Sequence, residues 1–319
     1  MYNREHLHVV VASDDNYAEF VATLLVSLFS SNAESFERIM VHLLANGIKP
    51  STIRRITEHI PADRGELLTY DISDISGRLG IEVPKTIAIS AYARLFIQSL
   101  LPQDISRVLY LDCDTIVADS LGELWQTDLK DCFVGGVLDT LPDTVAKTKV
   151  GLSEDMPYIN SGVLLIDLEQ WRKADLQSLF LNFLLSHGGH VHHHDQGLIN
   201  GVCKGHVKVL HPRYNLTTNY LSHRYDILRQ TNTPFYSEEQ ISEAKSHPAI
   251  IHFTAGFLTR PWCRGSRHPF ATLFRQMHGR TAWRDTPLRE DDRSLGIKLH
   301  SWTFLHLPQS WDKYIWRTK

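Results

Sequence analysis

Short apolar runs alternate along the chain with longer segments whose apolar residues recur every three or four positions. The short runs predict strands, and the periodic segments predict helices. Strands are expected at residues 7–12, 39–44, 67–70, 108–111, 133–138, 161–166 and 250–253. Helices are expected at residues 17–28, 51–60, 168–186, from 195 onward, and between a cap at Ser90 and a stop at Pro102. This alternation predicts an α/β fold, with a mainly parallel sheet covered by helices on both faces.

The pattern changes near Pro269, beyond which the chain is richer in Arg and Trp and has no clear strands. We therefore expect a main α/β domain at residues 1–265 and a small, mainly helical or irregular C-terminal extension at residues 266–319. Residues 302–319 combine three cations and a single acid with Trp302, Trp311 and Trp316. Aromatic rings mixed with cations suit the surface of an anionic membrane, so peripheral membrane contact is one interpretation. A tail packed on the main domain is the other.

Composition narrows the class of protein. The 319 residues are 43% hydrophobic and 22% charged, which is typical of a globular protein with a sizeable core. A formal net charge of -3 gives no reason to expect nucleic acid as a partner. No apolar run approaches the roughly 18 residues that span a bilayer, and no signal peptide precedes Leu7. The four cysteines lack paired spacing, so no disulfide framework is indicated and a reducing cytoplasm is the expected location.

Two carboxylates one residue apart, Asp112 and Asp114, follow the apolar run at residues 108–111. Open α/β sheets bind ligands beyond the carboxyl ends of their strands, which is where these side chains are expected. In extended chain they share a face, so both can ligate one hard cation whose other positions stay open for phosphate oxygens. Many such triplets are only solvated turns, so the surrounding clusters decide the interpretation.

Other polar clusters fall at predicted strand ends. Residues 12–17 offer acceptors and an aromatic ring suited to a nucleoside, although a helix N-cap explains Asp15 or Asn16 equally well. Asn160 and Ser161 enter an apolar strand and need partners, which a sugar hydroxyl or a buried turn can supply.

The histidine run at residues 190–194 is interpreted as a solvated loop, because adjacent histidines cannot all converge on one zinc ion. Asp195 and Gln196 follow it at a predicted helix N-terminus facing a pocket. His252 is either a core histidine or a third metal ligand. Arg260, in a loop with Gly256, can hold a pyrophosphate through charge-assisted contacts.

Taken in order, these motifs resemble the retaining glycosyltransferases of family 8. This group includes bacterial lipopolysaccharide galactosyl- and glucosyltransferases, with glycogenin as a distant relative. The matching segments are residues 12–17 (ASDDNY), 90–95 (SAYARL), 108–114 (VLYLDCD), 160–167 (NSGVLLID), 195–200 (DQGLIN) and 252–254 (HFT). The resemblance covers about residues 7–265. It implies a GT-A fold (Rossmann-like), a nucleotide-sugar donor that is usually a UDP-hexose, and a divalent metal, typically manganese.

The resemblance also implies roles for individual residues. The metal that bridges the donor diphosphate would be held by Asp112, Asp114 and His252. Uracil and ribose would be held by Ala12, Asp14, Asn16 and Tyr17. The donor hexose would be surrounded by Arg94, Asp112, Asn160, Ser161, Asp195 and Gln196, with Asp139 lining the sugar and acceptor side. Cys113 would contact the donor through its backbone. Arg260 replaces the family's usual Lys and lies farther from Gly256 than usual, so the pyrophosphate contact of this loop is expected in kind only.

The expected chemistry is transfer of galactose or glucose from a UDP-sugar to a saccharide or glycolipid acceptor in surface polysaccharide or lipopolysaccharide synthesis. Carboxylates plus one imidazole suit Mn²⁺ or Mg²⁺, and the imidazole favours Mn²⁺. We expect Asp195 to hold hexose hydroxyls and Gln196 to face the anomeric carbon, with retention of configuration. A dehydrogenase is set aside because no Gly-x-Gly-x-x-Gly follows the first strand. A sugar-nucleotide-binding protein and a UDP-sugar hydrolase or phosphatase remain as alternatives.

Overall fold

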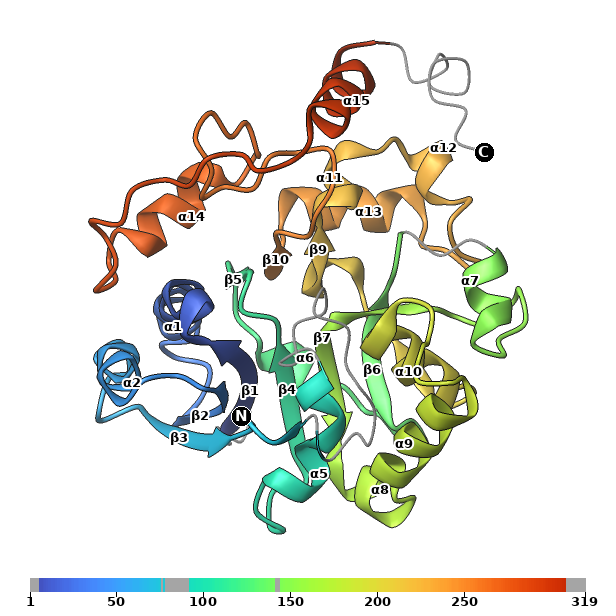
Figure 1. The fold of residues 1–319 in the computed structure, drawn as a ribbon, viewed down its shortest axis with the longest axis horizontal. Helices are drawn as coiled ribbons and strands as arrows, with labels where there is room; N and C mark the ends of the chain where they lie inside the picture. The colour runs from blue at the N-terminus through green and yellow to red at the C-terminus, as the bar shows by residue number, and fades with distance from the viewer. Residues whose placement is uncertain (1–5, 76, 78–91, 141–143, 308–319) are drawn as a thin grey trace.

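A seven-stranded sheet forms the centre of the protein. The structure is a computed structural model, which describes residues 6–75, 77, 92–140 and 144–307. Within these residues the strand order is β3-β2-β1-β4-β7-β6-β8 (Figure 1). The strands are β1 (Leu7–Asp14), β2 (Ile39–Asn46), β3 (Gly65–Asp71), β4 (Arg107–Leu111), β6 (Val134–Leu138), β7 (Ile159–Asp167) and β8 (Val207–Val209). The expected mainly parallel sheet is confirmed, because every neighbouring pair is parallel except the two that involve β7.

The direction of β7 positions two of the expected site residues. β7 runs antiparallel to both β4 and β6. Its amino end therefore lies at the edge of the sheet where the parallel strands have their carboxyl ends. The backbone N–H of Asp112, just beyond β4, donates to the carbonyl oxygen of Gly162 at 2.7 Å. Asn160 and Ser161, at the start of β7, are brought beside Asp112 in this way.

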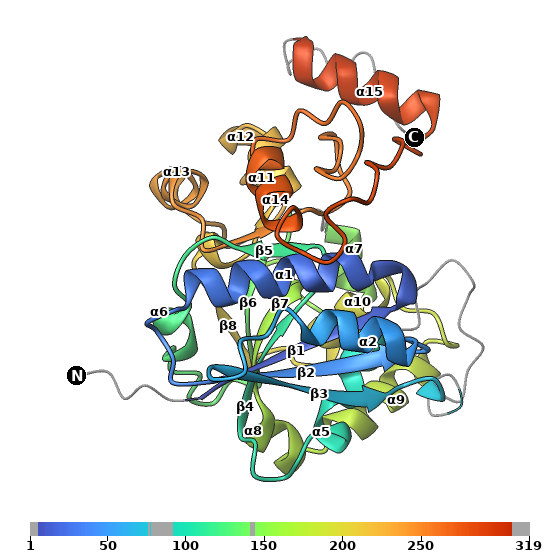
Figure 2. The same cartoon turned by 90° about the vertical axis from the view of Figure 1, so that its left-hand side faces the viewer.

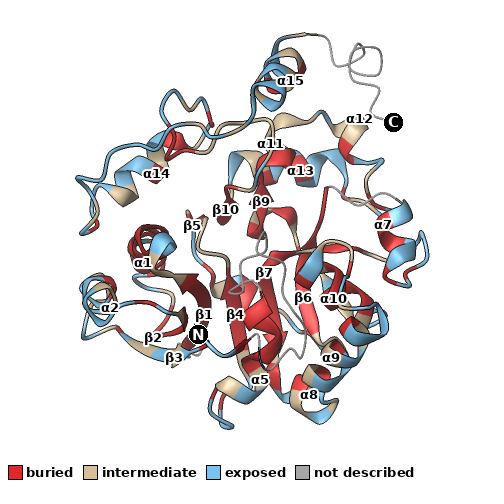
Figure 3. Ribbon diagram, in the orientation of Figure 1, coloured by how far each residue is buried: buried red, intermediate tan, exposed pale blue. Residues whose placement is uncertain are grey.

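Helices cover both faces of the sheet, as the alternating pattern predicts (Figures 1 and 2). Val9 and Val11 of β1 belong to the core cluster that contains Leu24, whereas Val10 belongs to the cluster that contains Phe96. Successive strand residues therefore face opposite helical layers. The first layer holds α1 (Ala18–Ser31) and α2 (Pro50–Thr57), and the second holds η2 (Ala93–Phe96), α5 (Ile97–Leu100), α8 (Leu168–Lys173), α9 (Leu176–Ser186) and α10 (His194–Val202). Figure 3 shows the buried strands between these layers.

Several boundaries differ from the sequence expectation, most of them by a few residues. β1 continues to Asp14 instead of ending at residue 12, and a short 3-10 turn, η1 (Asp15–Tyr17), precedes α1. The single helix expected at residues 168–186 is wrong. It is divided into α8 and α9 because Asp175 adopts a left-handed backbone with φ of 48°, which a continuous α-helix does not permit. The expected cap at Ser90 lies outside the described residues.

A small second sheet lies next to the carboxyl edge of the first. It contains β5 (Thr115–Val117), β9 (Leu216–Thr217) and β10 (Ile250–His252), in the order β5-β10-β9. β10 pairs antiparallel with β5, and the backbone N–H of Phe253 donates to the carbonyl of Asp114 at 3.0 Å. The strand expected at 250–253 is confirmed, and its pairing brings His252 to the residues that follow β4.

The remaining elements are short helices and turns, several of which pack near the second sheet. They are α6 (Gly122–Trp125), α7 (Thr144–Lys149), η3 (Pro212–Tyr214), α11 (Thr218–Ser222), α12 (Tyr225–Leu228), α13 (Glu238–Ser246), α14 (Ala271–His278) and α15 (Leu295–His306). α14 packs against α1, and α15 lies beyond it with much of its surface exposed (Figures 1 and 3). Within the described part of the chain, no helix combines the length and the apolar character needed to cross a bilayer. The division at residue 265 stays a prediction, and Trp311 and Trp316 lie outside the described residues.

Candidate active site

Two carboxylates and one imidazole meet beyond the end of β4. Potential ligand atoms of Asp112, Asp114 and His252 all lie within 4.8 Å of one another. The Nε2 atom of His252 is 3.2 Å from Oδ1 of Asp114 and 3.8 Å from Oδ2 of Asp112. His252 is buried, whereas both aspartates are partly exposed. Hard oxygen ligands with one imidazole fit a divalent cation of the manganese or magnesium type, so the donor set suits the expected metal.

Asn215 fixes the orientation of His252. The backbone N–H of Gly162 donates to Asn160 at 3.0 Å, so the Asn160 atom that faces it is the side-chain oxygen. That oxygen also accepts from the Asn215 amide nitrogen at 2.8 Å, which leaves the Asn215 oxygen 3.0 Å from Nδ1 of His252. Nδ1 must therefore carry a hydrogen, and Nε2 is directed to the carboxylates. Asn215 was not expected from the sequence, because a buried Asn in an irregular segment follows no period.

Arg94 links the two acidic parts of the site. Its Nη2 atom donates to Oδ1 of Asp112 at 2.8 Å, and its Nε atom lies 3.2 Å from Oδ2 of Asp195. The guanidinium lies 4.2 Å from the ring centre of Tyr110, whose hydroxyl donates to the same Asp112 oxygen at 2.9 Å. Arg94 also donates to the carbonyl of Ser161. One oxygen of Asp112 is thus fixed by two donors, and the other faces His252.

The charged groups of the site shift one another's pKa values in a way that favours positive charge beside the aspartates. Burial raises the pKa of Asp114, but His252 and Arg260 together outweigh burial and hold that pKa below its ordinary value. Burial lowers the pKa of His252, yet Asp114 and Asp112 reverse this and raise it. Burial also raises the pKa of Asp195, against the charge of Arg94. The two aspartates thus favour positive charge beside them, which is the charge that a bound cation would supply.

A second network lies on the sugar side expected from the sequence. The amide nitrogen of Asn160 donates to Asp139 at 2.9 Å and to Oε1 of Gln196 at 3.1 Å. The backbone N–H of Ser161 also donates to Oε1 of Gln196, at 3.2 Å, and the hydroxyl of Ser161 donates to Asp195 at 3.1 Å. The structure therefore joins these five expected residues, from β7, α10 and the position that follows β6, in one hydrogen-bonded group.

Gly162 leaves room for the cluster of potential metal ligands. A Cβ atom at this position would lie 2.2 Å from Cε1 of His252 and 2.8 Å from Oδ2 of Asp112. Distances this short are far below van der Waals contact, so any side chain at 162 would displace both residues. The strand that carries Asn160 and Ser161 thus needs a glycine beside the potential metal ligands.

The cluster expected to hold a nucleoside lies at the end of β1, next to β4. Oδ1 of Asp14 accepts from the backbone N–H groups of Asn16 and Tyr17, at 2.9 and 3.1 Å. The helix-cap interpretation is thus correct in kind, although the cap is Asp14 and not Asp15 or Asn16. Tyr17 keeps 37% of its surface exposed, and Ala12 is buried within β1. Cys113 is partly buried against two apolar clusters.

The loop after β10 places Arg260 near Asp114, one of the potential metal ligands. Burial raises the pKa of Tyr17 and the charge of Arg260 opposes that rise, while the same charge lowers the pKa of Asp114. The Nε atom of Arg260 is buried and has no hydrogen-bond partner in the described part of the protein. Such a donor is costly unless a ligand pairs with it. Gly256, four residues earlier, lies beside α11.

The histidine run is only partly solvated. His190 and His194 are exposed, but His193 is half-buried, and its Nδ1 atom lies 3.0 Å from the hydroxyl of Tyr158. His193 has φ of 59° and directly precedes α10. The expectation of a solvated loop is therefore wrong for His193, because the chain must turn there to direct α10 into the site.

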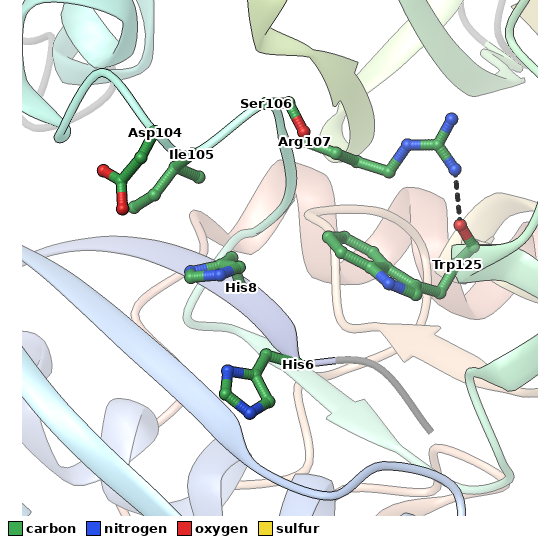
Figure 4. A pocket seen from close by; sticks show the side chains of 7 residues that line it. All are labelled: His6, His8, Asp104, Ile105, Ser106, Arg107 and Trp125. Carbon is green, nitrogen blue, oxygen red and sulfur yellow. Dashed lines mark hydrogen bonds between the residues drawn. The ribbon is translucent and has the colours of Figure 1, made fainter. Parts of the chain in front are cut away.

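A separate cavity of about 360 Å³ lies at the opposite edge of the sheet. Figure 4 shows its lining, which is His6, His8, Asp104, Ile105, Ser106, Arg107 and Trp125. His8 and Arg107 are near the amino ends of β1 and β4, whereas Asp14 and Asp112 are at the carboxyl ends of these strands. This cavity is therefore distinct from the site formed by the potential metal ligands.

Comparison with known proteins agrees with the fold and the motifs. The sequence model described as Glycosyl transferase family 8 matches residues 8–265. General stress protein A of Bacillus subtilis is 28% identical over 287 residues, which cover 89% of this chain and 96% of that protein. A lipopolysaccharide 1,2-glucosyltransferase of Escherichia coli is 24% identical over 291 residues, covering 90% of this chain and 82% of that protein.

A solved structure extends the likeness to three dimensions. The crystal structure of the galactosyltransferase LgtC in complex with donor and acceptor sugar analogs superposes with a TM-score of 0.73 and 27% sequence identity. The match covers 88% of this chain and 99% of LgtC. The chain belongs to glycosyl transferase family 8 and is a hexosyltransferase with the GT-A fold.

Proposed function

We propose that this enzyme transfers galactose or glucose from a UDP-hexose to a saccharide or glycolipid acceptor, with retention of configuration and with a divalent metal. The observation that carries the proposal is the position of Arg94 between Asp112, a potential metal ligand, and Asp195 of the sugar-side network. A diphosphate bound at the first group would place its attached sugar toward the second. The relatives named for lipopolysaccharide glucosyltransfer and galactosyltransfer support a role in surface polysaccharide synthesis.

The metal would be held by Asp112, Asp114 and His252, and we propose Mn²⁺ in preference to Mg²⁺ because one ligand is an imidazole. When bound, the cation supplies charge neutralisation for the leaving diphosphate. Asn215 orients the imidazole, and the two donors on Asp112 leave its second oxygen facing His252, where it would be free to bind the cation. The residues of this chain thus supply a preorganised site whose ligands need little rearrangement.

The donor nucleotide would lie between β1 and the loop after β10. Its pyrophosphate would accept from the buried Nε of Arg260, which has no partner among the described residues. Tyr17, with its partly exposed ring, would stack on uracil, and Asp14 and Asn16 would bind the nucleoside. The backbone of Ala12, Cys113 and Gly256 would complete the contact.

The chemical roles on the sugar side are proposed from the hydrogen bonds there. Asp195 would bind hexose hydroxyls, because its ion pair with Arg94 fixes it in place. Gln196 would place its carbonyl dipole near the anomeric carbon, and two N–H donors already fix the direction of that oxygen. Asp139 would line the acceptor side. A phosphate oxygen of the leaving UDP would accept the proton of the acceptor hydroxyl, since attack and departure share one face of the sugar.

The C-terminal region is proposed to contact the membrane from one side. Trp302 is 54% exposed and Leu299 58% exposed on α15, and neither of them is needed to cover the core. The tail that follows carries further Trp, Lys and Arg residues. An exposed apolar face continued by cations suits an anionic interface that presents a glycolipid. The cytoplasmic location expected from the sequence stays a prediction.

A screen of UDP-hexoses for Mn²⁺-dependent release of UDP, with and without saccharide acceptors, tests the proposal. Transfer predicts faster UDP release when the acceptor is added, and a glycosylated product by mass spectrometry. UDP release that no acceptor accelerates would favour the alternative, a UDP-sugar hydrolase. Binding of UDP without any release would favour a sugar-nucleotide-binding protein. Asp114→Asn should abolish the release, because it removes a charged ligand with little change in shape.

A further inference from the structure

We propose that Arg293 is a positioning residue for the donor site, acting through the loop that carries Gly256 and Arg260. The segment at residues 254–260 is called the donor loop below. The inference rests on the proposed function, because it takes this loop to bind the donor pyrophosphate. It adds a residue from beyond the matched family region of 8–265 to the machinery of the reaction.

The side chain of Arg293 binds the donor loop at three points. Its Nη1 atom donates to the carbonyl oxygens of Gly256 and Phe257, at 3.2 and 3.1 Å. Its Nη2 atom donates to the hydroxyl of Thr259 at 2.6 Å. One guanidinium therefore fixes most of the stretch that directly precedes Arg260.

The same guanidinium is fixed in turn by two other residues of the C-terminal region. Asp291 accepts from Nε and from Nη2, both at 2.9 Å, and the hydroxyl of Ser301 on α15 lies 3.2 Å from Nη1. Ser301 is buried, and the side chains of Arg293 and Asp291 are each about one-fifth exposed. A planar guanidinium that uses all its N–H groups in fixed directions is a rigid link, which Lys cannot replace.

Aromatic packing holds the donor loop to α15 independently of Arg293. The ring of Phe257 stacks on Phe304 at a centroid distance of 4.1 Å and meets His300 edge-on at 4.8 Å. On its other side the loop meets α11, where a Cβ atom at Gly256 would lie 3.0 Å from the side-chain oxygen of Asn219. The loop therefore lies between α11 and the C-terminal region, and its position depends on both.

These contacts bear on donor binding because Arg260 follows Thr259 directly. The buried Nε of Arg260 needs an acceptor placed with hydrogen-bond accuracy. A shift of about 1 Å in a positioning element can cost a large factor in binding or rate. Loss of Arg293 would release the carbonyls of the loop without touching the metal ligands or Gln196. We therefore expect weaker donor binding with little change in the chemical step.

The test compares Arg293→Met with the unaltered enzyme, using UDP affinity by calorimetry in saturating Mn²⁺ together with kcat and KM for the UDP-hexose. We expect the UDP dissociation constant and the donor KM to rise about tenfold, with kcat within about twofold. Arg293→Lys should recover little of this, because Lys cannot make the same set of contacts. Arg55→Met is the matched control. Arg55 also binds the C-terminal region, through the Ala282 carbonyl at 2.8 Å and the Trp283 ring, but it does not contact the donor loop.

A second, milder variant keeps the test valid if Arg293→Met unfolds. Thr259→Val removes one acceptor of Arg293 and keeps every charge, and it should weaken UDP about threefold by the same route. Unchanged UDP affinity in both Thr259→Val and Arg293→Lys would overturn the inference. Failure of the proposed function looks different, because the unaltered enzyme would then not bind UDP with Mn²⁺. If Arg260→Met binds UDP more weakly while Arg293→Lys and Thr259→Val bind it normally, the proposed donor site is supported and only the role of Arg293 is rejected.

Discussion

The side-chain oxygen of Asn215 lies 3.0 Å from Nδ1 of His252 and directs the other ring nitrogen to Asp114. Asn215→Ala removes this acceptor and lets the imidazole rotate. We expect Mn²⁺ affinity, measured by calorimetry with UDP present, to fall about 10- to 100-fold. Asn232→Ala is a matched control, because Asn232 is also buried and hydrogen-bonded but contacts Tyr158 instead of His252. Equal loss of metal affinity in both variants would show that general loosening, and not orientation of His252, is the cause.

Gly162 provides a test that adds a group instead of removing one. Gly162→Ala places a methyl group against His252 and Asp112, so we expect kcat/KM to fall at least about 100-fold through displaced ligands. The obstructing atoms belong to side chains, so the chain should still fold. Gly122→Ala in α6, where a Cβ meets a single atom at 3.5 Å, should retain activity. Normal activity of Gly162→Ala, with thermal unfolding unchanged, would contradict the proposed metal site.

Gln196→Ala tests the assignment of the anomeric side. If the amide acts chiefly on charge that develops during transfer, kcat should fall about 100- to 1000-fold while the donor KM changes little. A raised donor KM with normal kcat would instead assign Gln196 to ground-state binding. Proton NMR of the fresh product of the unaltered enzyme should show an α-glycosidic linkage. A β-linkage would contradict retention and the roles given to Asp195 and Gln196.

The structure sharpens the test of membrane contact. Deleting residues 302–319 would remove Phe304, which is buried and stacks on Phe257, so loss of activity would be ambiguous. The double variant Leu299→Glu, Trp302→Glu alters only exposed positions of α15. We expect it to weaken sedimentation with phosphatidylglycerol vesicles about tenfold and to leave UDP release unchanged. Leu179→Glu, at a 45% exposed position on α9, is the control. Equal vesicle binding by all three proteins would reject the contact.

A pH dependence of stability follows from His42 in β2. Burial, aided by the charge of His8, lowers the pKa of His42 from 6.5 to about 4. Between pH 6.5 and about pH 4, this histidine binds a proton in the unfolded chain but not in the folded protein. The free energy of unfolding therefore falls as the pH is lowered through this range, and above pH 6.5 this group does not affect it. The free energy of unfolding should be measured in urea at pH 7 and at pH 4.5, for the unaltered protein and for His42→Phe. Between these two pH values it should fall by about 2 kcal/mol less in His42→Phe than in the unaltered protein. An identical loss in both proteins would reject the assignment.

The sequence predicts the elements well where apolar periodicity is strong, as in β1, β2, β4 and α1. It does not predict the direction of β7, because a fully buried strand has the same apolar pattern in either direction. Direction decides the site here, since only an antiparallel β7 places Asn160 beside Asp112. The break at Asp175 was missed for a related reason. The apolar residues on both sides of it suit one helix, and a single left-handed residue leaves no periodic signal.

The expected metal ligands come together because their motifs are carried by strands, whose ends are well defined. Residues that act through them were missed. Asn215 and Tyr110 contact His252 and Asp112 through single hydrogen bonds. Asn215 belongs to no recognisable spacing, and Tyr110, although it lies in the matching segment 108–114, has the pattern of an ordinary strand residue. Arg293 lies beyond the matched region, in a segment with no clear strands, so only its three-dimensional contacts reveal it.

The small sheet β5-β10-β9 also bears on the synthesis of the chain. β10 lies between β5 and β9, so the contact of His252 with Asp114 joins residues that are separated by a long segment of chain. A nascent chain that has emerged only as far as β9 holds both carboxylates but neither the imidazole nor the donor loop. Since a ligand stabilises only the state that binds it, the proposed sugar nucleotide and metal would stabilise only chains that include β10 and the donor loop. The cell's own pool of substrate would then protect chains that carry the whole site from proteolysis, and chains that end before β10 would lack this protection.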